Sequence, residues 1–373
     1  MADNGEPVPG SLFIYAPNKI APVVFAAAYA VSAVGHIWQC LYIHYNSSRL
    51  IGLHPLCAVL FTLGYGLREY GAFNYFYTTQ NLLIFIFSQV FIYICPPLLE
   101  LANYHVLGRI FYYVPHCAPL PPGKVLRVFG GLMALVELLN ALGVALSANP
   151  TSSHTTQELG TYLTITAIAI QLAIIAIFVI MAAIFQRRCS KAGVSHNRTI
   201  STPINTLYAS MALIFTRCIY RLVQHMGNNT VKLKDVESLR TLSPVLRYEW
   251  FFYVFEASLM LINSALWNVW NPARYLPRDY HVYLSLDGRT EVQGEATPDG
   301  RSLLEKFASV MTFGIFFRPK KEEAGAFREH GQATPDKRSL LEKAGSVLTL
   351  GIFFRPKKGS GALRELEQLP STS

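Results

Sequence analysis

The chain contains 373 residues, of which 51% are hydrophobic and 15% are charged, and its mean hydropathy is +0.29. Soluble domains carry about 25% charged residues, so this composition excludes an ordinary soluble domain and favours a membrane protein. The formal net charge is +9. This charge requires no nucleic-acid partner, because basic loops and a basic tail beside an anionic membrane surface account for its sign.

Seven apolar stretches follow one another in the chain, and each is long enough to cross a hydrocarbon core of roughly 30 Å. Each is expected to be helical, because a bilayer offers no water to unpaired backbone groups and no strand-like alternation is present. The expected fold is an all-α integral membrane protein with a seven-transmembrane-helix bundle over residues 20–272. The expected spans are residues 20–44, 52–71, 79–104, 125–147, 159–185, 203–226 and 249–271.

Basic residues in the connections predict the orientation, since cytosolic loops are enriched in Lys and Arg. Residues 1–19 lack a signal-peptide pattern, so the first span is expected to be an uncleaved anchor with residues 1–19 outside. The connections after spans one, three and five are expected to be cytosolic and contain Arg49, Arg109, Lys124, Arg127, Arg187, Arg188, Lys191 and Arg198. One connection argues against this orientation. It lies between spans six and seven, on the side expected to be outside, yet it contains Lys232, Lys234, Arg240 and Arg247. The expected location is the plasma membrane, with an internal membrane as the alternative.

The polar region after the last span predicts a cytosolic tail over residues 273–373. It contains an internal repeat, ATPDGRSLLEKFASVMTFGIFFRPKK at residues 296–321 and ATPDKRSLLEKAGSVLTLGIFFRPKK at residues 333–358. Each copy has a capping box, apolar residues at helical spacing and a basic end. Two interpretations are open: an amphipathic helix that contacts anionic lipid of the inner leaflet or a partner, and a duplicated linker without fixed structure.

Ionisable side chains inside the spans cost about 2.5–3.5 kcal/mol each near the bilayer centre, so each calls for a partner or a function. In span six, Arg217, Arg221 and Gln224 share one helix face. In span seven, Glu249 and Glu256 also share one helix face. We expect the face of span six to meet the face of span seven, with Arg217 or Arg221 paired with Glu256. Further candidates for a polar core or substrate-binding site are His36, Arg68, Glu100, Tyr104, Glu137, Asn140 and Gln171.

These polar residues allow two interpretations. In one, they hold the helices in register, each contact contributing about 0.5–2 kcal/mol. In the other, they line a polar path for the charged head of an amphipathic molecule, and the combination of Arg and Glu suits a zwitterionic or amino-alcohol head group. His36 by itself is expected to be a hydrogen-bonded interior group rather than a ligand or proton carrier. Pro96 and Pro97 are expected to kink span three or end its regular part, which would leave Glu100 and Tyr104 close to a break.

Signatures of common enzymes are missing from the sequence. It has no Walker A loop, no G-x-S-x-G elbow, no H-E-x-x-H pair and no acidic cluster. We therefore expect no catalytic residue, no cofactor and no metal, and any transport would lack a built-in ATPase. The six cysteines lack the close pairing of a metal site and are expected to be free thiols.

Residues 12–277 resemble the fungal RTA-like family, named for resistance to aminocholesterol and also called the lipid-translocating exporter family. The matching stretches are Tyr15-Ala-Pro-Asn18, His36, Gly64-Tyr65 with Arg68, Pro96-Pro-Leu-Leu-Glu-Leu-Ala-Asn-Tyr104, Leu107-Gly-Arg109, Gly160 with Gln171, Arg217-Cys-Ile-Tyr-Arg221, Gly227, Glu249-Trp-Phe-Phe-Tyr-Val-Phe-Glu256 and Asn271-Pro272. Their order and spacing across the spans carry the resemblance, and the tail repeat lies outside it.

Several family positions differ in this chain. An acidic residue expected before Gly64 is absent, and Met133 stands where an aspartate is expected, with Glu137 one turn later. Asn140 stands where a glutamine is usual in the family, Gln224 replaces a glutamate, and Glu256 replaces an aspartate. These changes indicate a divergent member of the family.

The resemblance implies a role in lipid translocation or export and in tolerance to toxic amphiphiles, with a sphingoid long-chain base as the leading substrate. In this hypothesis Glu256 and Glu137 meet a cationic head group, while Arg217 and Arg221 position the carboxylates or contact phosphate. The alternative is a seven-helix sensor of lipid or stress signals that acts through its cytosolic tail. An intramembrane enzyme that uses His36 and a carboxylate is a third hypothesis.

Overall fold

The computed structural model describes residues 6–43, 52–147, 154–194, 197–227, 239–277, 282–285 and 290–294. Every described residue belongs to one compact unit of the chain, Met1–Lys320. The tail repeats at residues 296–321 and 333–358 lie outside the described residues, so both interpretations of them stay predictions.

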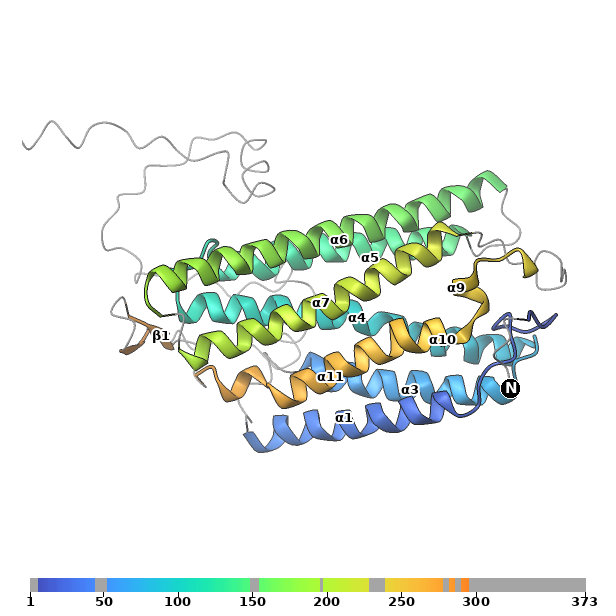
Figure 1. The fold of residues 1–373 in the computed structure, drawn as a ribbon, viewed down its shortest axis with the longest axis horizontal. Coiled ribbons are helices and arrows are strands. Elements are labelled where there is room, and N and C mark those ends of the chain that lie inside the picture. The colour runs from blue at the N-terminus through green and yellow to red at the C-terminus, as the bar shows by residue number, and fades with distance from the viewer. Residues whose placement is uncertain are drawn as a thin grey trace, which may run out of the picture. The chain divides into compact units, whose positions relative to one another are not determined.

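A long helical segment coincides with each of the expected spans (Figure 1). The first six are α1 (Ala21–Ile43), α3 (Leu53–Phe73), α4 (Thr79–Tyr113), α5 (Pro122–Ser147), α6 (His154–Lys191) and α7 (Arg198–Met226). The last begins after a short helix, α9 (Pro244–Arg247), and consists of α10 (Glu249–Phe252), a π-helical turn (Tyr253–Ser258), α11 (Leu259–Val269) and a 3₁₀ turn (Pro272–Arg274).

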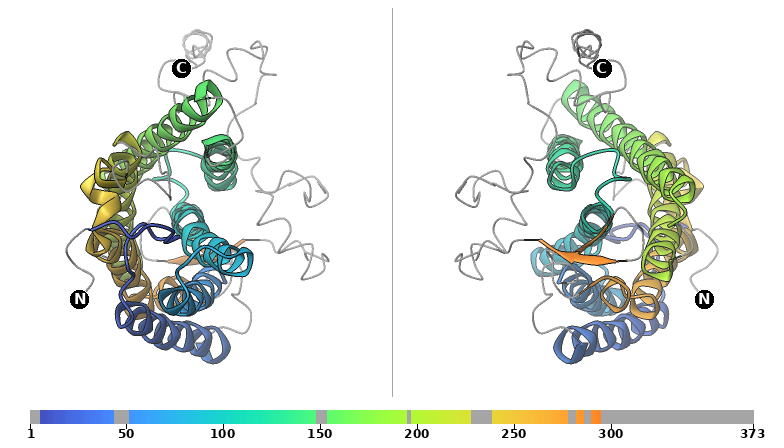
Figure 2. Two further views of the ribbon diagram at one scale, coloured as in Figure 1. Left: turned by 90° about the vertical axis from the view of Figure 1, so that its right-hand side faces the viewer. Right: turned by 90° about the vertical axis from the view of Figure 1, so that its left-hand side faces the viewer.

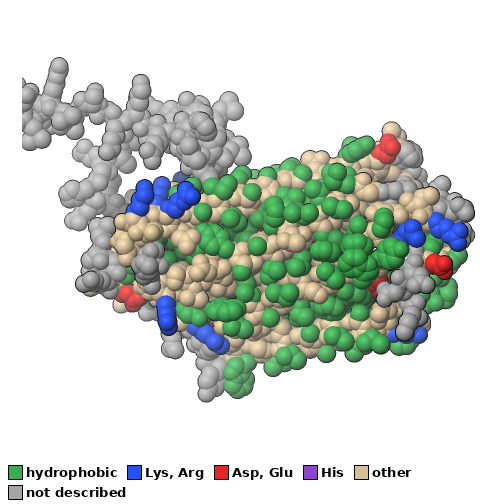
Figure 3. All heavy atoms as spheres, in the orientation of Figure 1, with side chains coloured by type: hydrophobic (Ala, Val, Ile, Leu, Met, Phe, Trp, Pro, Cys, Tyr) green, Lys and Arg blue, Asp and Glu red, His purple; other side chains and the backbone are tan. Residues whose placement is uncertain are grey.

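Six helical segments of the described chain are long and apolar enough to cross a membrane, which makes the chain an integral membrane protein. They are Ala21–Leu41, Thr79–Tyr113, Pro122–Ser147, Thr155–Lys191, Arg198–Met226 and Glu249–Arg274. Helix α3, which contains His54, Arg68 and Glu69, is as long as a span but is not among the six. On the face shown in Figure 3, hydrophobic side chains cover the helices and charged side chains gather toward their ends, as a bilayer requires.

Neighbouring helices pack mainly in chain order, from α1 against α3 to α6 against α7. Helix α11 packs against both α7 and α1, and α4 also contacts α7, so the last span closes the bundle beside the first (Figure 2). The α5–α6 contact is especially close, because a Cβ atom at Gly160 would lie 2.6 Å from the Gly143 carbonyl oxygen. Small residues allow such close approach between helices in lipid.

Of the two outcomes expected at Pro96 and Pro97, a kink or an end of the regular part, the end of the regular part is wrong. Helix α4 continues through both prolines to Tyr113, with both residues in its interior. Thiol groups bond to backbone carbonyls beside the prolines: Cys95 Sγ lies 3.0 Å from the Phe91 carbonyl oxygen, and Cys57 Sγ lies 3.7 Å from that of Cys95. The carbonyls that lose their donors at Pro96 and Pro97 are those of Ile92 and Tyr93, so these thiol bonds do not replace the lost ones. Both prolines are buried between helices, where membrane helices tolerate proline.

The irregular segment of the bundle lies instead in the last span, where Tyr253–Ser258 form a π-helical turn. Ser258 Oγ donates to the Tyr253 carbonyl oxygen at 2.8 Å within this turn. Single π turns inside helices occur frequently at functional sites. This one contains Glu256, so it sets the direction in which that carboxylate enters the bundle.

The start of the tail folds back as a small β-hairpin, which the all-α expectation missed. Strand β1 (Val282–Leu284) pairs antiparallel with β2 (Glu291–Gln293). The Tyr113 hydroxyl donates to Glu291 Oε1 at 2.9 Å, and Leu284 is buried against the core. Only three residues long, each strand is too short for a sequence signal.

Candidate functional site

A buried ion pair joins spans six and seven at the π turn. Arg217 Nε donates to Glu256 Oε1 at 2.8 Å, and Arg217 Nη2 lies 2.8 Å from the same oxygen. Arg217 is 6% exposed and Glu256 is fully buried. Of the two arginines that the residue spacing offered to Glu256, the structure selects Arg217. An unpaired charge at this depth would be strongly unfavourable, so the two groups require one another.

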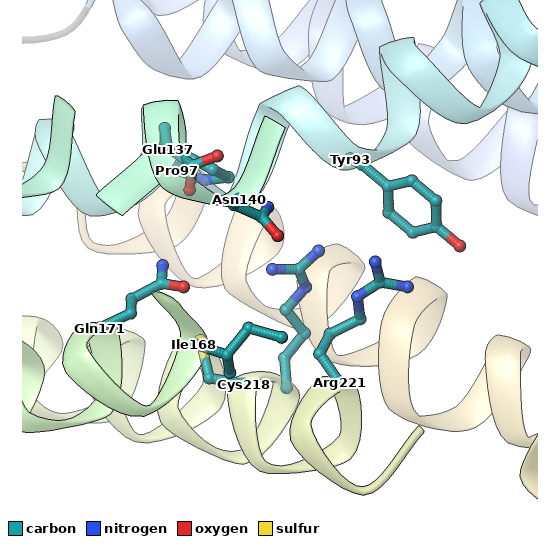
Figure 4. A pocket seen from close by; sticks show the side chains of 9 residues that line it. Tyr93, Pro97, Glu137, Asn140, Ile168, Gln171, Cys218 and Arg221 are labelled. Atoms are coloured by element: carbon teal, nitrogen blue, oxygen red, sulfur yellow. The ribbon is translucent and has the colours of Figure 1, made fainter. Parts of the chain in front are cut away.

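A small cavity lies beside this pair, between α4, α5, α6 and α7 (Figure 4). Its volume is about 30 Å³, which is room for one or two water molecules. The side chains that line it are Tyr93, Pro97, Glu137, Asn140, Ile168, Gln171, Arg217, Cys218 and Arg221. The cavity is therefore polar and carries both signs of charge, but in this conformation it is too small for a lipid head group.

The second arginine on the cavity wall is held in position by its neighbours. Arg221 Nη1 donates to Gln224 Oε1 at 2.8 Å, and its guanidinium lies 4.3 Å from the centre of the Tyr93 ring. On the facing wall, Glu137 and Asn140 project from α5 (Figure 4). Asn140 Oδ1 is buried and has no hydrogen-bond partner among the described residues. The wall thus offers a half-buried carboxylate and an unoccupied acceptor to a ligand.

Glu100 and Tyr104 lie behind one wall of the cavity rather than at a helix break. The Tyr104 hydroxyl donates to Glu100 Oε1, and Gln171 Nε2 donates to Glu100 Oε2 at 2.8 Å. Glu100 is fully buried. Because Gln171 both lines the cavity and bonds to Glu100, this carboxylate fixes the amide that the cavity presents.

Arg68 and Glu249 form a separate cluster that does not line the cavity. Arg68 Nη2 lies 3.0 Å from Glu249 Oε1, and the guanidinium lies 4.1 Å from the centre of the Phe252 ring. Arg68 also donates to the hydroxyl groups of Tyr15 and Tyr253, each at 3.2 Å. Burial raises the pKa of the Tyr15 phenol well above its usual value, although the Arg68 charge acts in the opposite direction. The cluster ties the N-terminal segment to α3 and to the last span.

His36 lies in a third polar cluster, formed by α1, α3 and α11. Its Nε2 lies 3.3 Å from Ser264 Oγ, and its ring stacks on that of His54 with centres 5.6 Å apart. Neither ring nitrogen of His54 and neither side-chain polar atom of Asn263 has a hydrogen-bond partner among the described residues. The expectation that His36 is a hydrogen-bonded interior group agrees with its bond to Ser264.

A family model described as RTA1 like protein matches residues 55–279. The chain belongs to the RTA1-like family. This confirms the resemblance seen in the sequence, and the matched region contains the whole cavity and the ion pair. No solved structure is significantly similar to the chain.

Relatives of this RTA1-like chain are named as lipid transporters. The lipid-translocating exporter-like protein RTA1 of Leptosphaeria maculans is 50% identical over 86% of this chain and 62% of its own length. A protein of the same name from Ajellomyces capsulatus is 31% identical over 64% of this chain and 75% of its own length. The probable lipid transporter atnI of Emericella nidulans is 24% identical over 74% of this chain and 71% of its own length. The chain thus spans 62% of the length of the Leptosphaeria relative.

The structure of this RTA1-like chain also contains site residues that sequence reasoning missed. Tyr93 and Cys218 line the cavity, and His54 stacks on His36. The sequence did contain a signal for Tyr93. It lies one helical turn before Pro97 and so shares the helix face of that proline, which the sequence had already singled out. His54 gave no such signal, since its partner is on another helix. Among the described residues, no group of three or more His, Cys, Asp or Glu side chains could hold a metal ion.

Proposed function

We propose that this protein translocates or exports a membrane lipid, with a sphingoid long-chain base or a similar amphiphile as substrate, and so supports tolerance to toxic amphiphiles. The observation that carries the proposal is the cavity between α4, α5, α6 and α7, where both signs of charge meet inside an apolar bundle. Polar and ionisable residues at such depth usually mark a substrate path. The transporter names of the relatives support the same class of function.

In this proposal the cavity receives the polar head of the lipid. Glu137 on the cavity wall offers a carboxylate to an ammonium group, and Asn140 and Gln171 offer hydrogen bonds to hydroxyl groups. Glu256 lies behind the wall and offers its carboxylate once the cavity opens. Arg217 holds Glu256 in place at 2.8 Å, and Arg221 contacts phosphate when the substrate carries it. Because the cavity volume is only about 30 Å³, the substrate enters a more open conformation. The π turn at Tyr253–Ser258 is the element best suited to rearrange, since its backbone bonding is already irregular.

The proposal includes seven membrane crossings, with residues 1–19 outside, the tail in the cytosol and the protein in the plasma membrane or an internal membrane. Helix α3 supports the count, because it packs lengthwise between α1 and α4 and returns the chain to the end where α1 began (Figure 1). Seven of the basic residues in the connections assigned to the cytosol belong to the described residues: Arg109, Lys124, Arg127, Arg187, Arg188, Lys191 and Arg198.

The test is efflux of a labelled sphingoid base from cells that express the protein at equal surface abundance. We compare the intact chain with Glu137→Gln, Glu256→Gln and the control Glu69→Gln, a half-buried glutamate of α3 that does not line the cavity. The expected result is efflux with the intact chain and the control, and at least a tenfold loss with Glu137→Gln and Glu256→Gln. Unchanged efflux in both Glu137→Gln and Glu256→Gln would refute the substrate path.

A lipid or stress sensor is the second candidate function. The observation that favours it is the contact between the start of the tail and the bundle, in which Tyr113 of α4 bonds to Glu291 of β2 at 2.9 Å. A sensor predicts that deletion of residues 295–373 removes the cellular response and leaves lipid distribution intact. A translocator predicts that efflux survives the same deletion.

A further inference from the structure

A long groove opens on the outer surface of the bundle between the first and last spans. It is lined by Ala28, Val31, Ser32, Gly35 and Gln39 of α1, by Leu261, Ala265, Asn268 and Val269 of α11, and by Arg274. Its volume is about 590 Å³, within the range of roughly 300–1,000 Å³ that ligand sites occupy. From Ala28 to Gln39 the groove follows α1 for roughly 16 Å, at 1.5 Å per residue.

The floor of the groove is polar although its walls are apolar. Asn268 Nδ2 donates to Ser32 Oγ at 2.7 Å, and Gln39 Nε2 donates to the Asn268 carbonyl oxygen at 2.8 Å. Asn268 Oδ1 is buried, and no described residue donates a hydrogen bond to it. A Cβ atom at Gly35 would lie 2.8 Å from this oxygen, so glycine lets α1 pack directly on the Asn268 amide. The polar groups of the floor are thus held against the protein, and the apolar walls are left to contact an acyl chain.

One end of the groove carries a positive charge at the level of the lipid head groups. Trp38 and Trp270 are 63% and 43% exposed at this end, and exposed tryptophans mark the boundary between membrane and water. Arg274 lies one turn beyond Trp270, is exposed, and its guanidinium forms no hydrogen bond or ion pair with another described residue. None of the residues that line the groove is acidic. The charge is therefore available to an anion.

We propose that this groove binds an anionic phospholipid, with its phosphate on Arg274 and one acyl chain along the apolar walls between α1 and α11. The lipid comes from the leaflet that faces the tail. It differs from the proposed transport substrate, because an arginine repels the ammonium group of a sphingoid base. The site lies on the surface of α1 and α11, whereas the cavity lies between α4, α5, α6 and α7. The inference does not depend on transport.

The test measures which lipids stay bound to the purified full-length protein by native mass spectrometry, with phosphatidylserine or phosphatidylcholine added in detergent. The variants are Arg274→Gln, which removes the charge, and Ala265→Phe, which fills the groove. The matched controls are Arg187→Gln, an exposed arginine at the same end of the bundle, and Ala27→Phe, an exposed alanine of α1 that does not line the groove.

We expect one phosphatidylserine to be retained in preference to phosphatidylcholine. Arg274→Gln should weaken its retention about fivefold, as loss of one basic contact predicts. Ala265→Phe should abolish the retention, and both controls should behave as the unmodified protein does. Equal retention of the two lipids, or retention of phosphatidylserine that is unchanged by Arg274→Gln, would overturn the proposal whatever Ala265→Phe does to folding.

Discussion

The Arg217–Glu256 pair shows how one contact serves both the fold and the proposed site. Both side chains are buried, and Glu256 Oε2 has no hydrogen-bond partner among the described residues. A buried ion pair often adds little net stability compared with apolar residues, yet removing one partner leaves an uncompensated charge. The second carboxylate oxygen is buried and does not line the cavity, so a substrate reaches it only in the more open conformation proposed above.

A rescue experiment separates these two roles. Arg217→Met should lower the free energy of unfolding by about 3–5 kcal/mol, because Glu256 then stays buried without a counter-charge. The double variant Arg217→Met with Glu256→Leu should recover most of that loss but no lipid efflux. Thermal unfolding in detergent and efflux in cells measure the two quantities. Recovery of efflux in the double variant would show that the pair only holds the helices together.

Asn263 differs from the Arg217–Glu256 pair, because it is a buried amide without any hydrogen-bond partner among the described residues. Leaving a buried polar group unsatisfied costs about 1–3 kcal/mol, so Asn263→Leu should raise the unfolding temperature. The matched control is Asn103→Leu, since Asn103 Nδ2 donates to Ser210 Oγ at 2.9 Å and its loss should lower that temperature. If both variants lower it equally, the Asn263 amide has a partner such as an internal water.

At the scale of elements, helix positions were predictable and helix irregularities were not. The spans expected at 79–104 and 159–185 correspond to α4 and α6, which extend beyond them at Thr79–Tyr113 and His154–Lys191. Length and apolarity determine where a helix crosses a bilayer, but its ends extend into the interface, where hydropathy gives no signal. The prolines of α4 suggested a break because their neighbours on other helices are invisible in the sequence. The π turn at Glu256 had no sequence signal.

The close α5–α6 contact gives a prediction at this scale. Gly160→Val should destabilise the bundle by roughly 1–3 kcal/mol, because the new side chain would meet the α5 backbone at Gly143. Gly131→Val is the control, since a Cβ atom at Gly131 would have no heavy atom within 4 Å. The unfolding temperatures of the two purified variants provide the comparison. Equal temperatures would mean that α5 and α6 can separate at no cost.

At the scale of the whole molecule, the number of crossings decides on which side the tail lies. Helix α3 is the deciding element, because the other long segments already meet the length and apolarity of a span. Its charged residues Arg68 and Glu69 lie near one end, and Arg68 is neutralised by Glu249 at 3.0 Å. A helix whose charge is paired inside the protein can cross a bilayer despite its low hydropathy.

Epitope tags at the two ends of the chain test this count. With seven crossings, a tag at the N-terminus should be accessible to antibody on intact cells, whereas a tag after Ser373 should require permeabilisation. Six crossings would place both tags on the same side of the membrane. A tag in the connection before α9 is the internal control, because it should share the side of the N-terminus in the seven-crossing arrangement.

The sequence by itself determined the membrane class, the places of the long helices, the family and a contact of Glu256 with Arg217 or Arg221, because each depends on composition or on spacing along one helix. Only the tertiary structure decided which polar residues meet. It assigned Glu249 to Arg68 and Glu100 to Gln171, although spacing alone had grouped Glu249 with the face that meets Arg217. The physical reason is that an unpaired charge in lipid needs a partner, but the partner is set by how the helices rotate and pack against each other.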